Sequence, residues 1–175
     1  GVVAAEMPAV FEPEALRAQA VAARTVTLYH MLCFESEAHP GADVCTDPAC
    51  CQAWVSDEEL REKWGGDYSA YLAKIAESIR STDGECLAYD NAPIQAVFHS
   101  SSAGMTAESD EVWAFSLPYL SSVVSPETAE TVPNYVSSVT VSVSDFKETV
   151  VRFYPDAVFP KDSATWVTDI TYTKS

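Results

Sequence analysis

Basic residues are scarce in this chain. Its 175 residues include 10 lysines and arginines against 26 aspartates and glutamates, which gives a formal net charge of -16 at pH 7. Proteins that bind nucleic acid neutralise phosphates with clustered basic side chains, and anionic membrane surfaces attract the same kind of cluster. The charge balance therefore argues against nucleic acid as a partner and disfavours binding to an anionic membrane surface.

Long apolar runs are absent as well. No stretch of 18 apolar residues occurs, so the sequence shows no membrane-spanning segment. It also has no internal repeat, phosphate-binding loop or low-complexity tract. The chain does have 47% hydrophobic residues and ten prolines. This composition and length are typical of one globular domain, predicted over residues 1–175.

The opening run contains a single charged side chain, Glu6, between Gly1 and Met7, and Pro8 closes it. Flanking aliphatic side chains can strip water from a carboxyl group, and desolvation disfavours its charged form. A glutamate shifted in this way can deliver a proton in a reaction and take one back. Glu6 is therefore a candidate acid/base.

A long helix is predicted next. Residues 14–34 contain neither Gly nor Pro and are rich in Ala, and Pro13 suits a first helical position, so the helix is expected to run to about residue 33. Gln19 and Arg24 lie among Ala and Val and need partners if they are buried. Such an arginine can clamp an anionic or hydroxyl-rich ligand. The alternative is a core helix with a snorkelling arginine.

Cysteine and histidine gather in a loop predicted over residues 36–53. His39, Cys45, Cys50 and Cys51 lie within 13 residues, and Cys33 precedes them. Zinc favours tetrahedral sulfur and imidazole ligands, so the loop predicts a structural zinc site. Cys33 can replace Cys50 or Cys51 in that set. A disulfide from Cys45 to Cys50 or Cys51, or free thiols, are the alternatives.

The rest of the chain is predicted to be scaffold with one binding edge. The expected elements are a helix opened by a capping box at Ser56–Glu59 and ended by Gly65, a helix over 67–80, a hairpin of 85–89 and 94–98, a strand over 138–144, a helix from 144 stopped by Pro155, and a strand over 166–172. Helices first and mostly antiparallel strands afterwards indicate an α+β fold. Asp110 and Glu111 are assigned to a helix start or a loop in preference to a second carboxylate site.

Three segments resemble one family. VVAAEMP followed by FEPEALRAQAVAART, then Val44-Cys45-Thr46-Asp47-Pro48 leading into Cys51-Gln52-Ala53-Trp54, then Ala96 to Gly104 with Thr106 and Val112-Trp113 behind it, are similar to the SpoIID family. These are the stage II sporulation protein D peptidoglycan lytic transglycosylases. The resemblance extends from residue 2 to about 125 and fades after about 135.

The resemblance implies a function. Glu6 matches the catalytic acid/base and Arg24 an arginine needed for activity. The family cleaves the MurNAc–GlcNAc bond of stem-peptide-free glycan strands without consuming water, leaving 1,6-anhydro-MurNAc ends. One carboxyl suffices for this, whereas ordinary glycosidases need two, so Glu12 and Glu14 are assigned to capping. A neutral glycan is compatible with the chain's charge.

Further expectations follow for binding and location. The polar turn with its three serines is expected to line the cleft, and Trp113, Phe115 and Tyr119 to stack on sugar rings. The substrate-binding candidates are Gln19, His99, Ser100, Ser101, Ser102 and Thr106. The resemblance also implies a structural zinc at His39, Cys45, Cys50 and Cys51, with Cys50 standing where a His is usual.

The biological setting also rests on the resemblance. It implies extracytoplasmic action during sporulation engulfment, with a membrane anchor in a segment absent from this chain. Partners would be membrane engulfment proteins. The competing interpretation is a non-catalytic glycan-binding module that enhances a partner amidase, since some members of the broader family act in that way.

Overall fold

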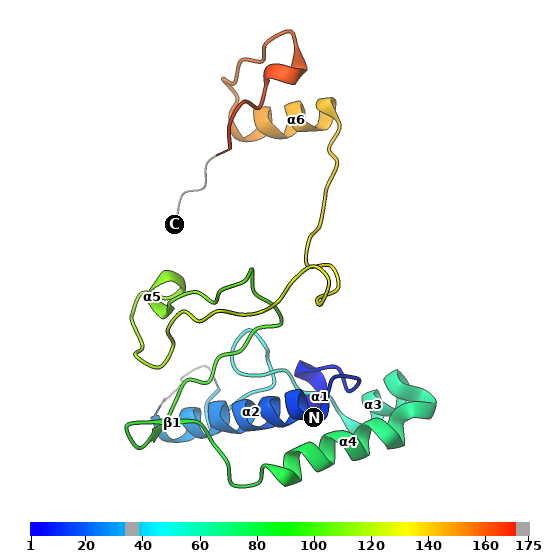
Figure 1. Ribbon diagram of the computed structural model, residues 1–175, viewed down its shortest axis with the longest axis vertical. Helices are drawn as coiled ribbons and strands as arrows, with labels where there is room; N and C mark the ends of the chain where they lie inside the picture. The colour runs from blue at the N-terminus through cyan, green and yellow to red at the C-terminus, as the bar shows by residue number, and fades with distance from the viewer. Residues whose placement is uncertain (34–38, 171–175) are drawn as a thin grey trace. The chain divides into compact units, whose positions relative to one another are not determined.

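A computed structural model describes residues 1–33 and 39–170 (Figure 1). Contacts within the chain gather into two compact units, residues 1–127 and residues 128–175, which are described separately below. The single domain expected over residues 1–175 remains a prediction. The start of the predicted Cys/His loop, residues 36–38, lies outside the described residues.

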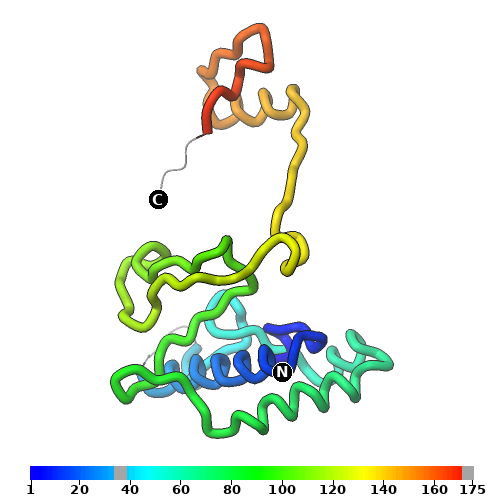
Figure 2. Tube along the Cα trace, viewed as in Figure 1, coloured from blue at the N-terminus to red at the C-terminus, as the bar shows by residue number. Residues whose placement is uncertain are grey.

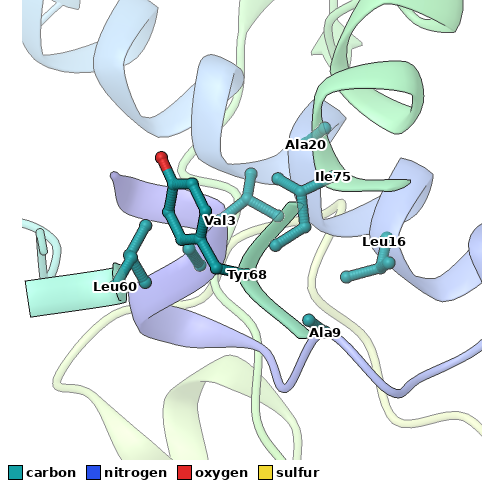
Figure 3. Close-up of a cluster of buried hydrophobic side chains, with 8 residues drawn as sticks. Val3, Ala9, Leu16, Ala20, Leu60, Tyr68 and Ile75 are labelled. Atoms are coloured by element: carbon teal, nitrogen blue, oxygen red, sulfur yellow. The ribbon is translucent and has the colours of Figure 1, made fainter. Parts of the chain in front are cut away.

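The first unit is organised around α2 (Pro13–Cys33), the long Ala-rich helix that the sequence predicts. The single-turn helix α1 (Val2–Glu6) packs on one side of it, and α4 (Tyr68–Ser81) packs along it. Buried apolar side chains of these helices and of neighbouring segments form one core, in which Leu16 is fully buried. Its other members include Val3, Ala9, Ala20, Leu60, Tyr68 and Ile75 (Figure 3). This core fixes α1, and with it Glu6, against α2.

Helix α3 (Asp57–Trp64) begins and ends where the sequence indicates. The Ser56 hydroxyl accepts a hydrogen bond from Glu59 N, and the Glu59 carboxylate accepts one from Ser56 N, which completes the predicted capping box. Gly65, at φ 50°, ends the helix, and the 3-10 turn η1 (Gly65–Asp67) leads into α4.

A small hairpin follows α4. Strands β1 (Ala88–Tyr89) and β2 (Ala92–Pro93) pair antiparallel in the register Ala88 with Pro93 and Tyr89 with Ala92. Asp90 and Asn91 between them both have positive φ, the conformation that a tight two-residue hairpin turn requires. The turn is therefore shorter than the predicted Asp90–Pro93 turn, and the strand predicted over 94–98 is wrong, because the second strand is Ala92–Pro93 and residues 94–98 form none.

Beyond the hairpin, residues 101–106 and 122–127 run antiparallel and enclose a loop that contains α5 (Ser109–Val112). Met105 and Val124 form a β-bridge, Thr106 N donates to Val123 O at 2.9 Å, and Ser125 N donates to Gly104 O at 2.9 Å. Figure 2 traces this green-to-yellow part of the chain out and back. Asp110 and Glu111 lie in the first turn of α5, which confirms their assignment to a helix start.

The second unit is small. Helix α6 (Val143–Phe153) is capped by the Ser142 hydroxyl, and the 3-10 turn η2 (Ser163–Thr165) follows later. Trp166 packs against Phe146 and Phe159, with ring centroids 6.4 Å and 4.6 Å apart, and its indole N–H donates to Pro160 O at 2.7 Å. The second unit is thus held together in part by a cluster of aromatic side chains around Trp166.

The fold class is confirmed only in its broad outline. Helices come first and antiparallel pairing follows, but the described residues contain one two-stranded sheet instead of the extended sheet expected. The strand predicted over 138–144 is wrong, because α6 already begins at Val143. Residues 166–170 form no strand, and the remainder of that prediction, residues 171–172, lies outside the described part. Among the described helices, none is both long and apolar enough to cross a membrane.

Candidate active site

Glu6 lies at the last position of α1, half-buried, where it meets the end of the Cys/His loop. Its Oε1 accepts a hydrogen bond from the backbone N–H of Ala53 at 2.8 Å. A carboxylate held by a backbone donor keeps a fixed direction, and the donor cannot be lost by rotation of a side chain. Glu6 is therefore a half-buried carboxylate held in one orientation.

The Glu6 pocket, as we name it, is a cavity of about 300 Å³ beside this carboxylate. Three parts of the first unit enclose it: the face of α2, the segment 50–52, and the chain just after the hairpin. Its lining residues are Glu6, Val26, Tyr29, His30, Pro48, Cys50, Cys51, Gln52, Gln95, Ala96, Val97 and Phe98. Glu6 is the one carboxylate among these residues, so the pocket suits chemistry in which a single group moves protons.

Gln52 attaches the wall of the Glu6 pocket to α2. Its side chain is buried, and its Nε2 donates to Ala23 O at 3.1 Å and to Thr27 Oγ1 at 3.4 Å. Its Oε1 is buried and has no hydrogen-bond partner among the described residues. The attachment holds residues 50–53 in place, so that the Ala53 N–H reaches Glu6. Sequence reasoning included Gln52 in a matched motif but gave it no role.

The four predicted metal ligands come together. One ligand atom from each of His39, Cys45, Cys50 and Cys51 lies within 4.8 Å of every other, so the cluster can hold a metal ion. His39 Nε2 lies 3.4 Å from Cys51 Sγ, while its Nδ1 lies 2.9 Å from Ala42 O. Metal-binding histidines commonly donate their second ring N–H to a carbonyl in this way.

A tight turn brings neighbouring Cys50 and Cys51 to the same centre. The N–H groups of both cysteines donate to Asp47 O, at 3.0 Å and 2.8 Å, and Ala49 N donates to the Asp47 carboxylate at 2.8 Å. This turn places both cysteines in the ligand cluster. Cys33 is not a member of the cluster, and no disulfide joins the five cysteines, all of which lie in the described residues.

The thiols of the cluster influence one another. A hydrogen bond from the Asp47 backbone, followed by the neighbouring sulfurs, lowers the pKa of Cys45. Hydrogen bonding with Cys45 and Cys51 raises the pKa of Cys50 to about 11. Cys45 therefore forms a thiolate more readily than usual, whereas Cys50 does so less readily. A bound cation would stabilise several thiolates at these short distances from one another.

Arg24 and Gln19 lie away from the Glu6 pocket. The Arg24 guanidinium donates to three carbonyls after and at the end of α4: Thr82 O and Glu85 O, both at 2.8 Å, and Ile79 O at 3.4 Å. Gln19 is buried among the core helices, and its Nε2 has no partner among the described residues. Neither lines the Glu6 pocket, so their catalytic and substrate-binding roles remain predictions.

A second and larger cavity, the aromatic pocket, has a volume of about 730 Å³ and shares Val97 and Phe98 with the Glu6 pocket. Three of the predicted binding residues, His99, Ser102 and Thr106, line it. Trp113 and Tyr119 line it too, whereas Phe115, Ser100 and Ser101 do not. The two pockets are therefore neighbours along one surface of the first unit.

The hydroxyl-bearing residues in and next to the lining of the aromatic pocket have different hydrogen-bond partners. Thr106 Oγ1 accepts from Val123 N at 2.9 Å, which ties it to the opposite segment. Ser101 Oγ and Ser102 N both donate to the carboxylate of Glu127, at 2.5 Å and 2.6 Å. Sequence reasoning did not identify Glu127, because nothing in its local pattern marks a residue that binds a loop 25 positions earlier.

Comparison with known proteins gives consistent results. The SpoIID family model, described as "Stage II sporulation protein", matches residues 1–89. The chain is 40% identical over 148 residues to stage II sporulation protein D of Bacillus subtilis (strain 168), and 39% identical over 148 residues to that of Bacillus amyloliquefaciens. Each alignment covers 85% of this chain and 43% of the relative.

A third relative carries a different name. The amidase enhancer of Bacillus subtilis (strain 168) is 34% identical over 120 residues, which is 69% of this chain and 14% of that protein. The chain thus spans less than half the length of each of these curated relatives. The matched region includes both the Glu6 segment and the metal-ligand cluster, since the family model covers both.

Proposed function

Because this chain belongs to the SpoIID family of stage II sporulation proteins, we propose that its Glu6 pocket is the active site of a peptidoglycan lytic transglycosylase. The observation that carries the proposal is a single oriented carboxylate at the side of a pocket next to a larger cavity lined by aromatic and hydroxyl groups. The substrate is the stem-peptide-free glycan strand.

In this mechanism Glu6 acts twice. As an acid it protonates the glycosidic oxygen between MurNAc and GlcNAc while the C1–O bond breaks. As a carboxylate it then takes the proton from the 6-hydroxyl of the same MurNAc, whose oxygen closes on C1 to give the 1,6-anhydro end. No water enters, so no second carboxylate is needed, in contrast to most glycosidases. The Ala53 N–H keeps the carboxylate pointing in one direction through both steps.

We assign to the aromatic pocket the binding of the sugar units of the glycan that lie next to the cleaved bond. Trp113 and Tyr119 offer flat apolar faces with polar edges, which suit the faces of sugar rings. His99, Ser102 and Thr106 add hydrogen-bonding groups for sugar hydroxyls and acetamido groups. Ser100, Ser101 and Gln19, predicted as binding residues, do not line either pocket. Arg24 does not line either pocket, and its contacts support a role in holding the end of α4.

We assign the metal at His39, Cys45, Cys50 and Cys51 to zinc with a structural role. Tetrahedral bonds of ~2.3 Å to sulfur and ~2.0 Å to nitrogen place two sulfurs about 3.8 Å apart, and sulfur and nitrogen about 3.5 Å apart. The corresponding distances here are 3.8 Å from Cys50 Sγ to Cys51 Sγ and 3.4 Å from Cys51 Sγ to His39 Nε2. Four protein ligands would fill a zinc shell, so the ion would stabilise the loop and would not activate water.

The setting is inferred from the family. We place the protein outside the cytoplasm, anchored by a segment absent from this chain, and acting on the wall during engulfment with membrane partners. The second candidate function is a non-catalytic, glycan-binding module that enhances a partner amidase. The 34% sequence identity to a protein named amidase enhancer favours this second function. The aromatic pocket could bind glycan in either case.

Product analysis separates the two. Wild-type chain and the Glu6→Ala variant are incubated with stem-peptide-free glycan strands, and the products are identified by mass spectrometry. Anhydro-muramic ends from the wild type alone support the transglycosylase. Reducing ends indicate hydrolysis, with a base not identified here. Glycan that stays bound but intact in both samples favours the amidase-enhancer function.

A further inference from the structure

The carboxylate of Glu127, the last residue of the first unit, accepts three hydrogen bonds from within that unit. One carboxylate oxygen accepts hydrogen bonds from Ser101 Oγ at 2.5 Å and Ser102 N at 2.6 Å, and the other accepts from Ser125 Oγ at 3.0 Å. From this geometry we propose that Glu127 is a positioning residue for glycan binding, which holds the His99–Ser102 turn as a wall of the aromatic pocket. This inference rests on the proposed function.

Backbone pairing alone does not hold that turn. The backbone hydrogen bonds between residues 101–106 and 122–127 join Thr106 to Val123 and Ser125 to Gly104. Gly104, at φ 90°, then turns the chain in a way that most side chains resist. Beyond this point the Glu127 side chain makes the contacts that a strand partner would otherwise supply. The turn therefore depends on one carboxylate.

The turn held in this way presents groups to the cavity. His99 and Ser102 line the aromatic pocket, and Ser102 Oγ is a buried hydroxyl with no hydrogen-bond partner among the described residues. Because Glu127 binds the backbone N–H of Ser102, it fixes the point from which this side chain projects. The His99 ring, on the same turn, lines the pocket and can hydrogen-bond a hydroxyl or acetamido group of a sugar.

Glu127 remains charged while it does this. Its bonds with Ser101 and Ser102, then with Ser125, and the nearby charge of His99 lower the pKa of its carboxyl. Glu127 lines neither the Glu6 pocket nor the aromatic pocket, so it is not placed to contact the reacting bond. Its effect is expected on the binding of the strand and not on the step that Glu6 carries out.

Two substitutions in the 175-residue chain separate positioning from general stability. Glu127→Ala removes all three hydrogen bonds, whereas Glu127→Gln keeps a carbonyl for Ser101 and Ser102 and an amide that can donate to Ser125 Oγ. Glu62→Ala, on the exposed part of α3 and outside both pockets, is the control for loss of one negative charge. Each variant is assayed for cleavage of stem-peptide-free glycan strands and for binding to them.

Glu127→Ala should raise KM, and weaken glycan binding, by about tenfold or more, the size expected for charge-assisted hydrogen bonds, with kcat changed less than about twofold. Glu127→Gln should stay within about threefold of wild type. A fall in the kcat of Glu127→Ala at constant KM would overturn the proposal. So would an equal loss of glycan binding in Glu127→Ala and Glu127→Gln.

Hydrogen exchange provides a readout that needs no activity. In Glu127→Ala, amides of the peptide covering residues 99–106 should exchange faster than in wild type, and those of α2 should not change. Unchanged exchange in residues 99–106 would overturn the positioning role even if the wild type cleaves glycan. If the wild type neither cleaves nor binds glycan, the proposed function fails, and the exchange result still decides whether Glu127 holds the turn.

Discussion

The carboxylate of Glu6 and the backbone N–H of Ala53 are joined at 2.8 Å, although 47 positions separate them in the chain. Ala53 stands two residues after Cys51, a member of the metal-ligand cluster, and next to Gln52, which is bound to α2. The direction of the candidate acid/base is therefore set by the same segment that closes the Cys/His loop. Helix α1, a single turn, could not fix it alone.

The first prediction concerns proton transfer by Glu6. A Glu6→Gln variant keeps an oxygen that can accept from Ala53 N, so its structure and melting temperature should match those of wild type. Its cleavage of denuded glycan should fall by roughly 10²- to 10⁴-fold, the usual contribution of a general acid/base. Release of anhydro-muramic ends, quantified by mass spectrometry, measures this.

The matched control for this prediction is Glu12→Gln, which neutralises an exposed glutamate just before α2. It should cleave like wild type. Retention of wild-type cleavage by Glu6→Gln, with Glu12→Gln equally active, would mean that another group moves the protons.

The second prediction tests what Arg24 does. Its guanidinium satisfies carbonyls at Ile79, Thr82 and Glu85, so Arg24→Ala should leave them without these donors and lower the free energy of unfolding by about 2 kcal/mol. Urea unfolding followed by far-UV circular dichroism measures the change. Arg80→Ala is the control, because Arg80 makes an exposed pair with Glu77 that should contribute less than about 1 kcal/mol.

The outcome also bears on catalysis. If Arg24→Ala unfolds like wild type and yet fails to cleave glycan, Arg24 acts on the substrate and its role at the end of α4 is secondary. If stability and cleavage fall together, and Arg24→Lys restores part of both, the role is structural.

The third prediction concerns metal binding. The chain purified with zinc should hold one ion, and Cys45→Ser should lose most of it and melt at a lower temperature, because metal binding contributes to folding free energy. Elemental analysis and thermal unfolding with and without a chelator measure both effects. Cys86→Ser removes an exposed thiol outside the cluster and should change neither. Equal zinc content in Cys45→Ser and wild type would rule out this ligand set.

The sequence predicts well those features that local chemistry decides. The extent of α2 follows from a run of Ala without Gly or Pro, and the start of α3 follows from a capping box in which both partners lie within four residues. The ligand cluster was predicted by spacing, since His39 and three cysteines lie in one loop. These features need no knowledge of distant segments.

What failed depends on partners far along the chain. An alternating segment such as 138–144 becomes a strand only where another strand bonds to it, and within residues 128–170 the structure instead begins α6 at Val143. The hydrogen bond from Ala53 to Glu6, and those from Arg24 to carbonyls 55 to 61 residues away, leave no local pattern. The turn at Asp90-Asn91 did carry a signal, because both residue types tolerate positive φ.

The fourth prediction uses the capping box of α3 as a probe of acid stability. The Ser56 N–H and then the Ser56 hydroxyl lower the pKa of Glu59, so the charged form is favoured in the folded chain. A carboxyl whose folded pKa is lowered contributes stability above its unfolded pKa of ~4.3, and that contribution is lost as pH falls through the folded pKa. Ser56→Ala removes the cap acceptor and one donor to Glu59.

Ser56→Ala should therefore lower the free energy of unfolding by about 1 kcal/mol at pH 7, and by less at an acidic pH below the lowered pKa of Glu59, where Glu59 is protonated in both chains. Glu59→Gln is the companion variant, since a glutamine completes a capping box without titrating. It should be nearly as stable as wild type at pH 7 and lose less stability on acidification. Urea titrations at the two pH values give the comparison. A Ser56→Ala deficit that grows as pH falls would show that the bonds to Glu59 do not stabilise its charged form in the folded chain.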